Sequence, residues 1–229
     1  MSLKEQLSTL KAESLSKKSK EIQKTMFDDL ERLSKSGLIE GAPKTGEKLQ
    51  NFTLSNQLGE ERSLSKLREN GPVVVTFYRG GWCPYCNLEL HAYQEILPQI
   101  KAAGATLVAI TPELPDASLS TSEKHGLGFE VLTDTNSDYA RKIGIVFTLA
   151  EELRPIYESF GIQIEKHNGK GQFDLPLAAT FVVDVDGTIA CAFVEADYTL
   201  RAEPSDVVEA LQSLAKANSK GSLTQPPCA

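Results

Sequence analysis

Three features are missing from this sequence of 229 residues, and each absence excludes a class of protein. No apolar run approaches the roughly 18 residues that cross a bilayer. No excess of positive charge is present, because 24 Lys and Arg face 31 Asp and Glu for a net charge of −7. The first twenty residues, MSLKEQLSTLKAESLSKKSK, lack the apolar core of a secretory signal. We therefore expect no membrane or nucleic-acid partner and a cytoplasmic location.

Cysteine is also scarce, with four residues that are too few and too scattered for a disulfide scaffold. Cys191 and Cys228 stand apart from the others, and Cys191 fits a small apolar residue of a strand. Cys83 and Cys86 occur together as Cys-Pro-Tyr-Cys. This pair is the candidate for chemistry.

The N-terminal region predicts one helix over residues 4–38, within a helical extension that covers residues 1–40. Its apolar side chains recur mostly at steps of three, four or seven residues and form one stripe: Leu7, Leu10, Leu15, Ile22, Met26, Leu30 and Leu33. Two interpretations stay open. The stripe packs either against its own domain or against a second subunit in a homodimer.

Residues 43–217 predict a three-layer α/β domain. Buried strands are expected at residues 72–78, 105–110 and 179–183, a further strand at 129–132, and a short hairpin edge at 51–64. Helices are expected at residues 84–102, 118–124, 137–143 and 150–159, and a last one begins at Pro204. The Asp-Gly step at residues 186–187 predicts a terminal hairpin whose second strand is 188–194. Residues 218–229 are polar and predict a loose tail.

The two neighbouring cysteines lie where a buried strand passes through Gly80 and Gly81 into a helix. The free N–H groups and the dipole of a helix start stabilise a thiolate and lower its pKa. Two cysteines three apart at such a start also close a disulfide with little rearrangement, which permits a two-electron cycle. Half of a zinc site and a buried inert pair are the alternatives. Zinc needs four ligands and no second pair is present, so we expect neither metal nor another cofactor.

The segment from Trp82 to Cys86 resembles the active-site turn of thioredoxins, and Cys-Pro-Tyr-Cys is the tetrapeptide common in glutaredoxins. The wider frame resembles peroxiredoxins of the alkyl hydroperoxide reductase and thiol-specific antioxidant superfamily. Phe77, Cys86 and Glu89 match the spacing of the aromatic residue, the peroxidatic cysteine and the glutamate of that family. The resemblance covers residues 43–195 and implies a thioredoxin-like fold of the peroxiredoxin type.

The site departs from the peroxiredoxin pattern at two positions. Cys83 stands where the family has Thr or Ser, and Ala178 stands where it usually has an arginine. The chain therefore resembles the peroxiredoxin-like branch that carries a thioredoxin-type CxxC. Arg79 and Arg201 are the candidates for the missing cation, with a solvated surface arginine as the alternative for each. We interpret Trp82 as a lid over the dithiol and as part of a docking surface.

The function that the resemblance implies is a thiol peroxidase that reduces hydroperoxides. Cys86 would attack the peroxide, Cys83 would resolve the sulfenic acid as a disulfide, and a thioredoxin- or glutathione-type reductant would restore the pair. The two roles are open to exchange, because the first cysteine attacks in thioredoxins. A protein disulfide reductase and a non-catalytic redox sensor are the alternative functions.

Overall fold

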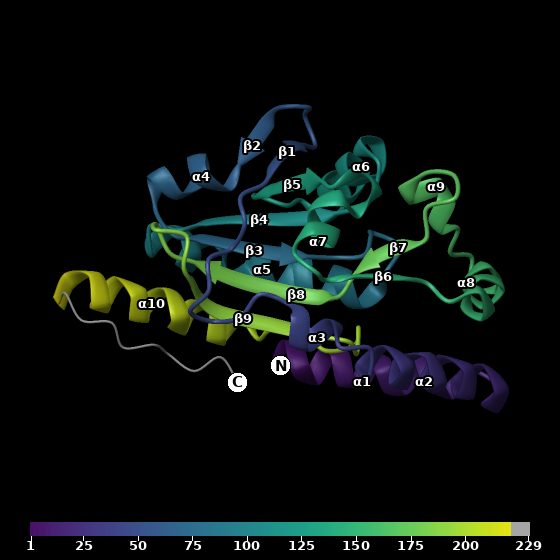
Figure 1. Cartoon of the computed structure of the whole chain (residues 1–229). Helices are drawn as coiled ribbons and strands as arrows, with labels where there is room; N and C mark the ends of the chain where they lie inside the picture. Colours follow the sequence, from purple (N-terminus) through teal and green to yellow (C-terminus); the bar gives the residue numbers. More distant parts are fainter. Residues whose placement is uncertain (221–229) are drawn as a thin grey trace.

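The computed structural model describes residues 1–220, which fold around a central sheet of seven strands (Figure 1). The strand order is β2-β1-β5-β4-β3-β8-β9. The strands are β1 (Thr53–Asn56), β2 (Glu61–Ser63), β3 (Val73–Phe77), β4 (Thr106–Thr111), β5 (Glu130–Thr133), β8 (Ala178–Val183) and β9 (Ile189–Glu195). The helices are α1 (Leu3–Ser16), α2 (Lys20–Ser34), α3 (Leu38–Gly41), α4 (Leu64–Leu67), α5 (Pro84–Ala102), α6 (Pro115–His125), α7 (Asp138–Lys142), α8 (Arg154–Ser159), α9 (Ile164–Asn168) and α10 (Pro204–Lys220).

The two faces of the sheet are both covered, which makes the three predicted layers. In β3, Val74 packs with apolar side chains of α5 and α10, whereas Val73 and Val75 pack with those around α7 on the opposite face. Because alternate residues of a strand point to opposite faces, a strand buried on both sides is expected to be largely apolar, and β3 is so except at Thr76. The continuous apolar run in the sequence therefore marked a central strand correctly.

The sheet mixes parallel and antiparallel pairs as the sequence indicated. β3 and β4 are parallel, as are β4 and β5, and helices connect them. β8 runs antiparallel to β3 and continues into β9 through the predicted Asp-Gly turn. In that turn Gly187 has a positive φ of 90°, and its N–H donates to the carbonyl of Asp184 at 2.9 Å.

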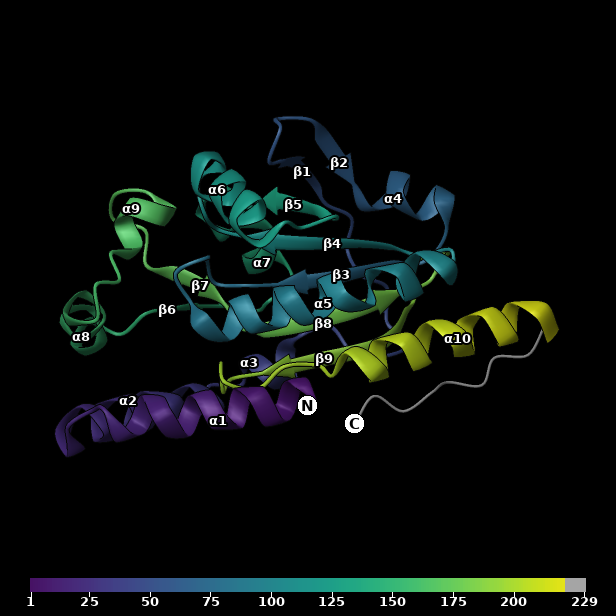
Figure 2. The same ribbon diagram turned by 180° about the vertical axis from the view of Figure 1, so that it is seen from behind.

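The prediction of one long N-terminal helix is wrong, because the chain forms two helices there. The Ser19 side chain accepts a hydrogen bond from the N–H of Ile22 and caps the start of α2. The Gln23 amide of α2 donates to the carbonyls of Leu15 and Lys18, both at 3.0 Å, and so links the start of α2 to the end of α1. Serine favours a helix start over a helix interior, so the chain turns here and α2 lies alongside α1 (Figures 1 and 2).

The resulting hairpin of α1 and α2 packs against its own domain. Leu3 and Leu7 are 3% exposed and belong to the apolar cluster of α5 and α10, and Leu33 is equally buried in the cluster on the other face. The apolar stripe is therefore partnered within the chain. The homodimer stays a prediction, and so do the proposed domain limits.

The stretch between β5 and β8 holds elements that the sequence analysis missed. β6 (Val146–Thr148) and β7 (Asp174–Pro176) form a separate antiparallel pair, and α8 and α9 lie between them. The predicted helix at 150–159 is divided into a 3₁₀ turn (Glu151–Leu153) and α8. Strands of three residues carry too little periodicity to be recognised.

The C-terminal helix is longer than expected. α10 ends at Lys220, so residues 218–220 of the predicted tail are helical. The rest of that tail, with Cys228, lies outside the described residues. Within residues 1–220, no helix is both long and apolar enough to span a membrane.

Candidate functional site

The turn between β3 and α5 is built around the side chain of Trp82. Gly80 adopts a φ of 152°, and a Cβ there would lie 2.2 Å from the indole nitrogen. A Cβ on Gly81 would lie 2.1 Å from the hydroxyl of Thr121 on α6. Both contacts are too short for any side chain, so the two glycines are what allow Trp82 and α6 to pack against this turn.

Cys83 and Cys86 occupy the first turn of α5. Cys83 is the N-cap residue, Pro84 follows at the first helical position, and both cysteines are free. Both are 0% exposed. The Cys86 thiol is hydrogen-bonded to Cys83, so the two sulfurs are neighbours as the spacing predicted.

Arg79 lies against the first of these cysteines. One guanidinium nitrogen is 3.1 Å from the Cys83 sulfur, and another donates to the hydroxyl of Tyr157 at 3.1 Å. The guanidinium also lies 4.0 Å from the ring centre of Tyr198 and 5.1 Å from that of Trp82. Arg79 is only 4% exposed, and it contacts no carboxylate of the described residues. Cys83 is therefore its neighbour best able to carry a negative charge.

Arg201 lies against the second cysteine, but it shares its charge with a carboxylate. One of its nitrogens is 3.2 Å from the Cys86 sulfur, and its Nε donates to Glu89 at 2.6 Å. Its remaining nitrogen donates to the carbonyls of Tyr198 and Leu200. The loop that follows β9 is thus held to the start of α5. The structure brings both candidate arginines to the dithiol, one to each sulfur, and neither is a solvated surface residue.

These contacts separate the acidities of the two thiols. Burial alone would raise the pKa of Cys83, but the hydrogen bond from Cys86 and the charges of Arg79 and Arg201 bring that pKa well below its ordinary value. Burial raises the pKa of Cys86 well above its ordinary value, and the hydrogen bond to Cys83 and the Cys83 charge raise it further. These contacts favour the negative charge on Cys83 over Cys86, because Arg201 beside Cys86 also binds Glu89.

Glu89 is the buried acid of the site. Burial raises its pKa to about 7, although Arg201 acts in the opposite direction. Its second carboxylate oxygen accepts a hydrogen bond from the hydroxyl of Thr76 at 3.1 Å. A group with this pKa accepts and returns a proton at neutral pH.

Aromatic rings form the walls around the two arginines. Trp82 meets Tyr157 edge to face with ring centres 5.9 Å apart, and Tyr85 meets Tyr198 in the same way at 5.6 Å. Trp82 is half-buried and lies against Arg79 and Tyr157. The role of Trp82 as a lid stays a prediction.

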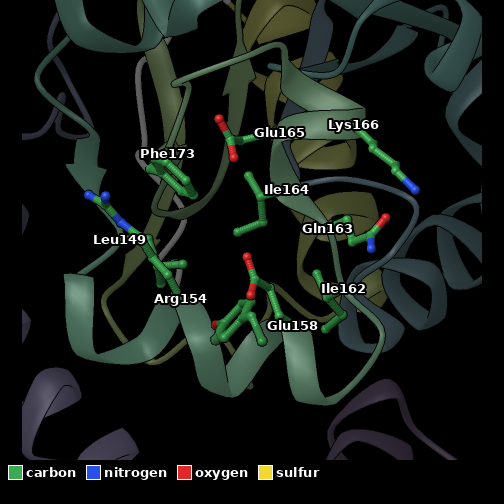
Figure 3. Close-up of a pocket in the computed structure, with 10 residues that line it drawn as sticks. Leu149, Arg154, Glu158, Ile162, Gln163, Ile164, Glu165, Lys166 and Phe173 are labelled. Carbon is green, nitrogen blue, oxygen red and sulfur yellow. The ribbon is translucent and has the colours of Figure 1, made fainter.

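A separate cavity of about 220 Å³ is lined by residues of α8 and α9 and of the segments beside them (Figure 3). Side chains of α8 and α9 line it, among them Arg154, Glu158, Ile164 and Glu165. Neither cysteine belongs to this lining. Tyr157 lines this cavity and also accepts a hydrogen bond from Arg79, so it is common to the cavity and the dithiol site.

Sequence reasoning missed three residues of the site. Tyr157 and Tyr198 contact Arg79 from segments far along the chain, and nothing in their sequence neighbourhoods indicates this. Glu89 did carry a signal, because a residue three positions after Cys86 lies on the same side of the helix. That spacing matches the family pattern but does not by itself indicate what Glu89 does.

The fold and the site together define a dithiol protein with a thioredoxin-like architecture. The family model described as the AhpC/TSA family matches residues 45–192. The chain belongs to this family, and the expected resemblance to peroxiredoxins is confirmed.

The curated relatives of this chain carry peroxiredoxin names. A chloroplastic peroxiredoxin Q of Populus jackii is 32% identical over 100 residues, which are 44% of this chain and 46% of the relative. A putative peroxiredoxin bcp of Coxiella burnetii is 23% identical over 66% of this chain and 87% of its own length. The chain spans about half the length of the peroxiredoxin Q relatives that it matches.

Solved structures confirm the predicted fold. Peroxidoxin BcpB from Mycobacterium tuberculosis aligns with a TM-score of 0.59 at 21% identity, over 75% of this chain and 97% of that one. Peroxiredoxin 6 of Arenicola marina aligns with a TM-score of 0.62 at 16% identity, over 78% of this chain and 76% of that one. At these identities the two structures show the shared fold and nothing further about this chain.

Proposed function

We propose that this protein is a thiol peroxidase that reduces hydroperoxides through a dithiol-disulfide cycle of Cys83 and Cys86. The observation that carries the proposal is the placement of one buried arginine against each sulfur at the start of α5. An arginine at this place lowers a thiol pKa and stabilises the negative charge that develops on a peroxide oxygen. The peroxiredoxin names of the relatives support the same activity.

The order of the two cysteines follows from their charges. The Cys83 thiolate attacks one oxygen of the hydroperoxide and breaks the O–O bond, which leaves a sulfenic acid and an alkoxide that takes up a proton. Cys86 then attacks the Cys83 sulfur and forms the disulfide, and the sulfenic oxygen departs as water. Glu89 is suited to accept the Cys86 proton in this second step. A thioredoxin- or glutathione-type thiol returns two electrons and two protons.

This order exchanges the roles that the peroxiredoxin spacing implied. Cys86 occupies the peroxidatic position of the family pattern, but Glu89 shares the charge of its arginine. Cys83 faces an arginine without a carboxylate partner in the described part of the chain. A negative charge is therefore better stabilised on the Cys83 sulfur than on the Cys86 sulfur.

Stopped-flow measurement of hydrogen peroxide consumption by the reduced protein tests the activity. A rate no faster than that of a free thiol would exclude it. Cys83→Ser and Cys86→Ser form a matched pair for the order of attack. We expect Cys83→Ser to lose the first turnover, and Cys86→Ser to keep it and accumulate a sulfenic acid that a mass-tagged trapping reagent detects. The reverse pattern would return the attacking role to Cys86.

One observation favours a second candidate function, a disulfide reductase that acts on proteins. Cys83 replaces the hydroxyl residue of the peroxiredoxin pattern, and the more acidic thiol is the first of the pair, as in thioredoxins. Reduction of insulin disulfides measures this activity. Insulin reduction without peroxide consumption would favour the reductase over the peroxidase.

The cytoplasmic location is proposed on composition alone.

A further inference from the structure

The hairpin of α1 and α2 precedes the stretch that matches the family, yet it contacts the walls of the dithiol site. The Lys11 ammonium pairs with Asp197 at 2.7 Å, at the start of the loop that carries Tyr198 and Arg201. Ser14 of α1 lines a small cavity together with Tyr85, which lies between the two cysteines in the sequence, and with Tyr198. α1 thus lies beside both ends of the site, and Figure 2 shows it below the end of α5 where these cysteines lie.

The second helix of the hairpin backs the arginine that holds Cys83. Met26 and Leu30 of α2 line a narrow cavity of about 20 Å³ together with Arg79, Tyr157 and Tyr198. This volume is about enough to hold one water molecule. The closed hairpin therefore helps to keep solvent away from the Arg79 guanidinium.

Oxidation of the pair changes the charge balance at this point. In the reduced protein the Cys83 thiolate offsets the positive charge of Arg79. Disulfide formation removes two electrons from the two sulfurs, and the thiolate charge is lost with them. The remaining contacts of Arg79 are neutral: the hydroxyl of Tyr157 and the rings of Tyr198 and Trp82. A cation that is 4% exposed is then left without its anion, which is strongly unfavourable unless water reaches it.

We propose that the α1–α2 hairpin is a redox-sensitive cover that determines which molecules reach the dithiol. While the pair is reduced, the hairpin is closed and admits small oxidants only. After the disulfide forms, the unpaired charge of Arg79 loosens the hairpin and exposes the disulfide to a protein dithiol. The proposal rests on the dithiol-disulfide cycle of the proposed function.

The reductant that this cover selects is a protein with two thiols. Its first thiolate attacks one sulfur of the disulfide and forms a mixed disulfide between the proteins. Its second thiol then attacks that bond and releases the reduced pair, so the partner leaves as a disulfide. Return of the thiolate restores the anion beside Arg79 and lets the hairpin close.

Hydrogen exchange of the full chain tests the redox step directly. The protein is compared in its reduced form and after oxidation with diamide, which takes up two electrons from the pair, the proton of the Cys86 thiol and one proton from water. We expect amides of α1 and α2 to exchange at least tenfold faster in the oxidised protein, and amides of β3 and β4 to be unchanged. Equal exchange of the hairpin in both forms would overturn the proposal. Diamide replaces peroxide here, so the result is independent of peroxidase activity.

Arg79→Gln separates the charge from the disulfide itself. Glutamine retains hydrogen-bonding groups and removes the cation, so oxidation should no longer accelerate exchange in the hairpin. Arg141→Gln is the matched control, because Arg141 is half exposed and pairs with Asp174 away from the dithiol. It should keep the wild-type difference. An undiminished difference in Arg79→Gln would refute the charge-driven opening.

Lys11→Ala tests the fastening of the cover without changing the redox site. The reduced variant should react about fivefold faster with a polymer-linked maleimide, while its rate with iodoacetamide stays within twofold of the wild type. Lys24→Ala is the control, because Lys24 forms an exposed pair with Asp28 inside α2. Equal acceleration by both reagents would show general unfolding and contradict a size-selective cover.

Discussion

Substitution of Arg79 by glutamine should raise the pKa of the Cys83 thiol. The guanidinium lies 3.1 Å from the sulfur in a site closed to solvent. A hydrogen bond to a charged group contributes about 1.5–3 kcal/mol. One pKa unit corresponds to about 1.4 kcal/mol, so the pKa should rise by about 1–2 units. Less thiolate is then present at neutral pH, and its reactions slow there but recover as the pH rises.

The ultraviolet absorbance of the thiolate, followed against pH, measures this shift. Titration of Cys86→Ser and of its double variant with Arg79→Gln assigns the change to Cys83 alone. Arg141→Gln should titrate as the wild type does, because Arg141 lies beside Asp174 and not beside the sulfurs. A shift below about 0.3 units in Arg79→Gln would refute the electrostatic account of this thiol.

Three further predictions concern stability. The pKa of Glu89 is about 7 in the folded protein against an ordinary 4.5, so the folded state binds more protons between these two pH values. The free energy of unfolding should therefore fall by about 3 kcal/mol as the pH rises from 4.5 to 7. Urea unfolding at a series of pH values should show a smaller fall for Glu89→Gln. Gly80→Ala should lower the free energy of unfolding by about 1–3 kcal/mol and change the fluorescence of Trp82, the single tryptophan. Gly37→Ala is the control, because Gly37 also has a positive φ but faces open space, and it should leave the fluorescence unaltered. Tyr157→Phe removes a partner of the buried guanidinium and should cost about 1–3 kcal/mol in urea unfolding, and no loss would contradict that contact.

Local patterns predicted most of the elements that carry the site. The run before Gly80 is a strand buried on both faces, and the cysteines open the helix that follows. These features depend on neighbours within a few residues, so apolar periodicity and the strand-Gly-Gly-helix order reveal them. The helix break at Ser19 was not predicted, because the sequence does not distinguish a serine that caps a helix from a serine inside one.

The identity of the cation beside each sulfur was not available from the sequence. Arg79 and Arg201 were both candidates, but their assignment required the loop after β9 to return to the start of α5. The same holds for Tyr157, which reaches Arg79 from a segment that the sequence analysis interpreted only as a helix. Contacts between distant segments follow from how the layers pack, and no local propensity encodes them.

The sequence by itself determined that this chain is an α/β protein with a dithiol at a helix start, because strand periodicity, helix caps and the Cys-Pro-Tyr-Cys spacing are local properties. Only the tertiary structure decided which thiol is the more acidic and what covers it. The acidity depends on Glu89 sharing the charge of Arg201 while Arg79 has Cys83. The cover depends on a hairpin fastened through Lys11 and Asp197, which are 186 positions apart. Both are consequences of through-space electrostatics and packing, which arise only when the distant parts of the chain meet.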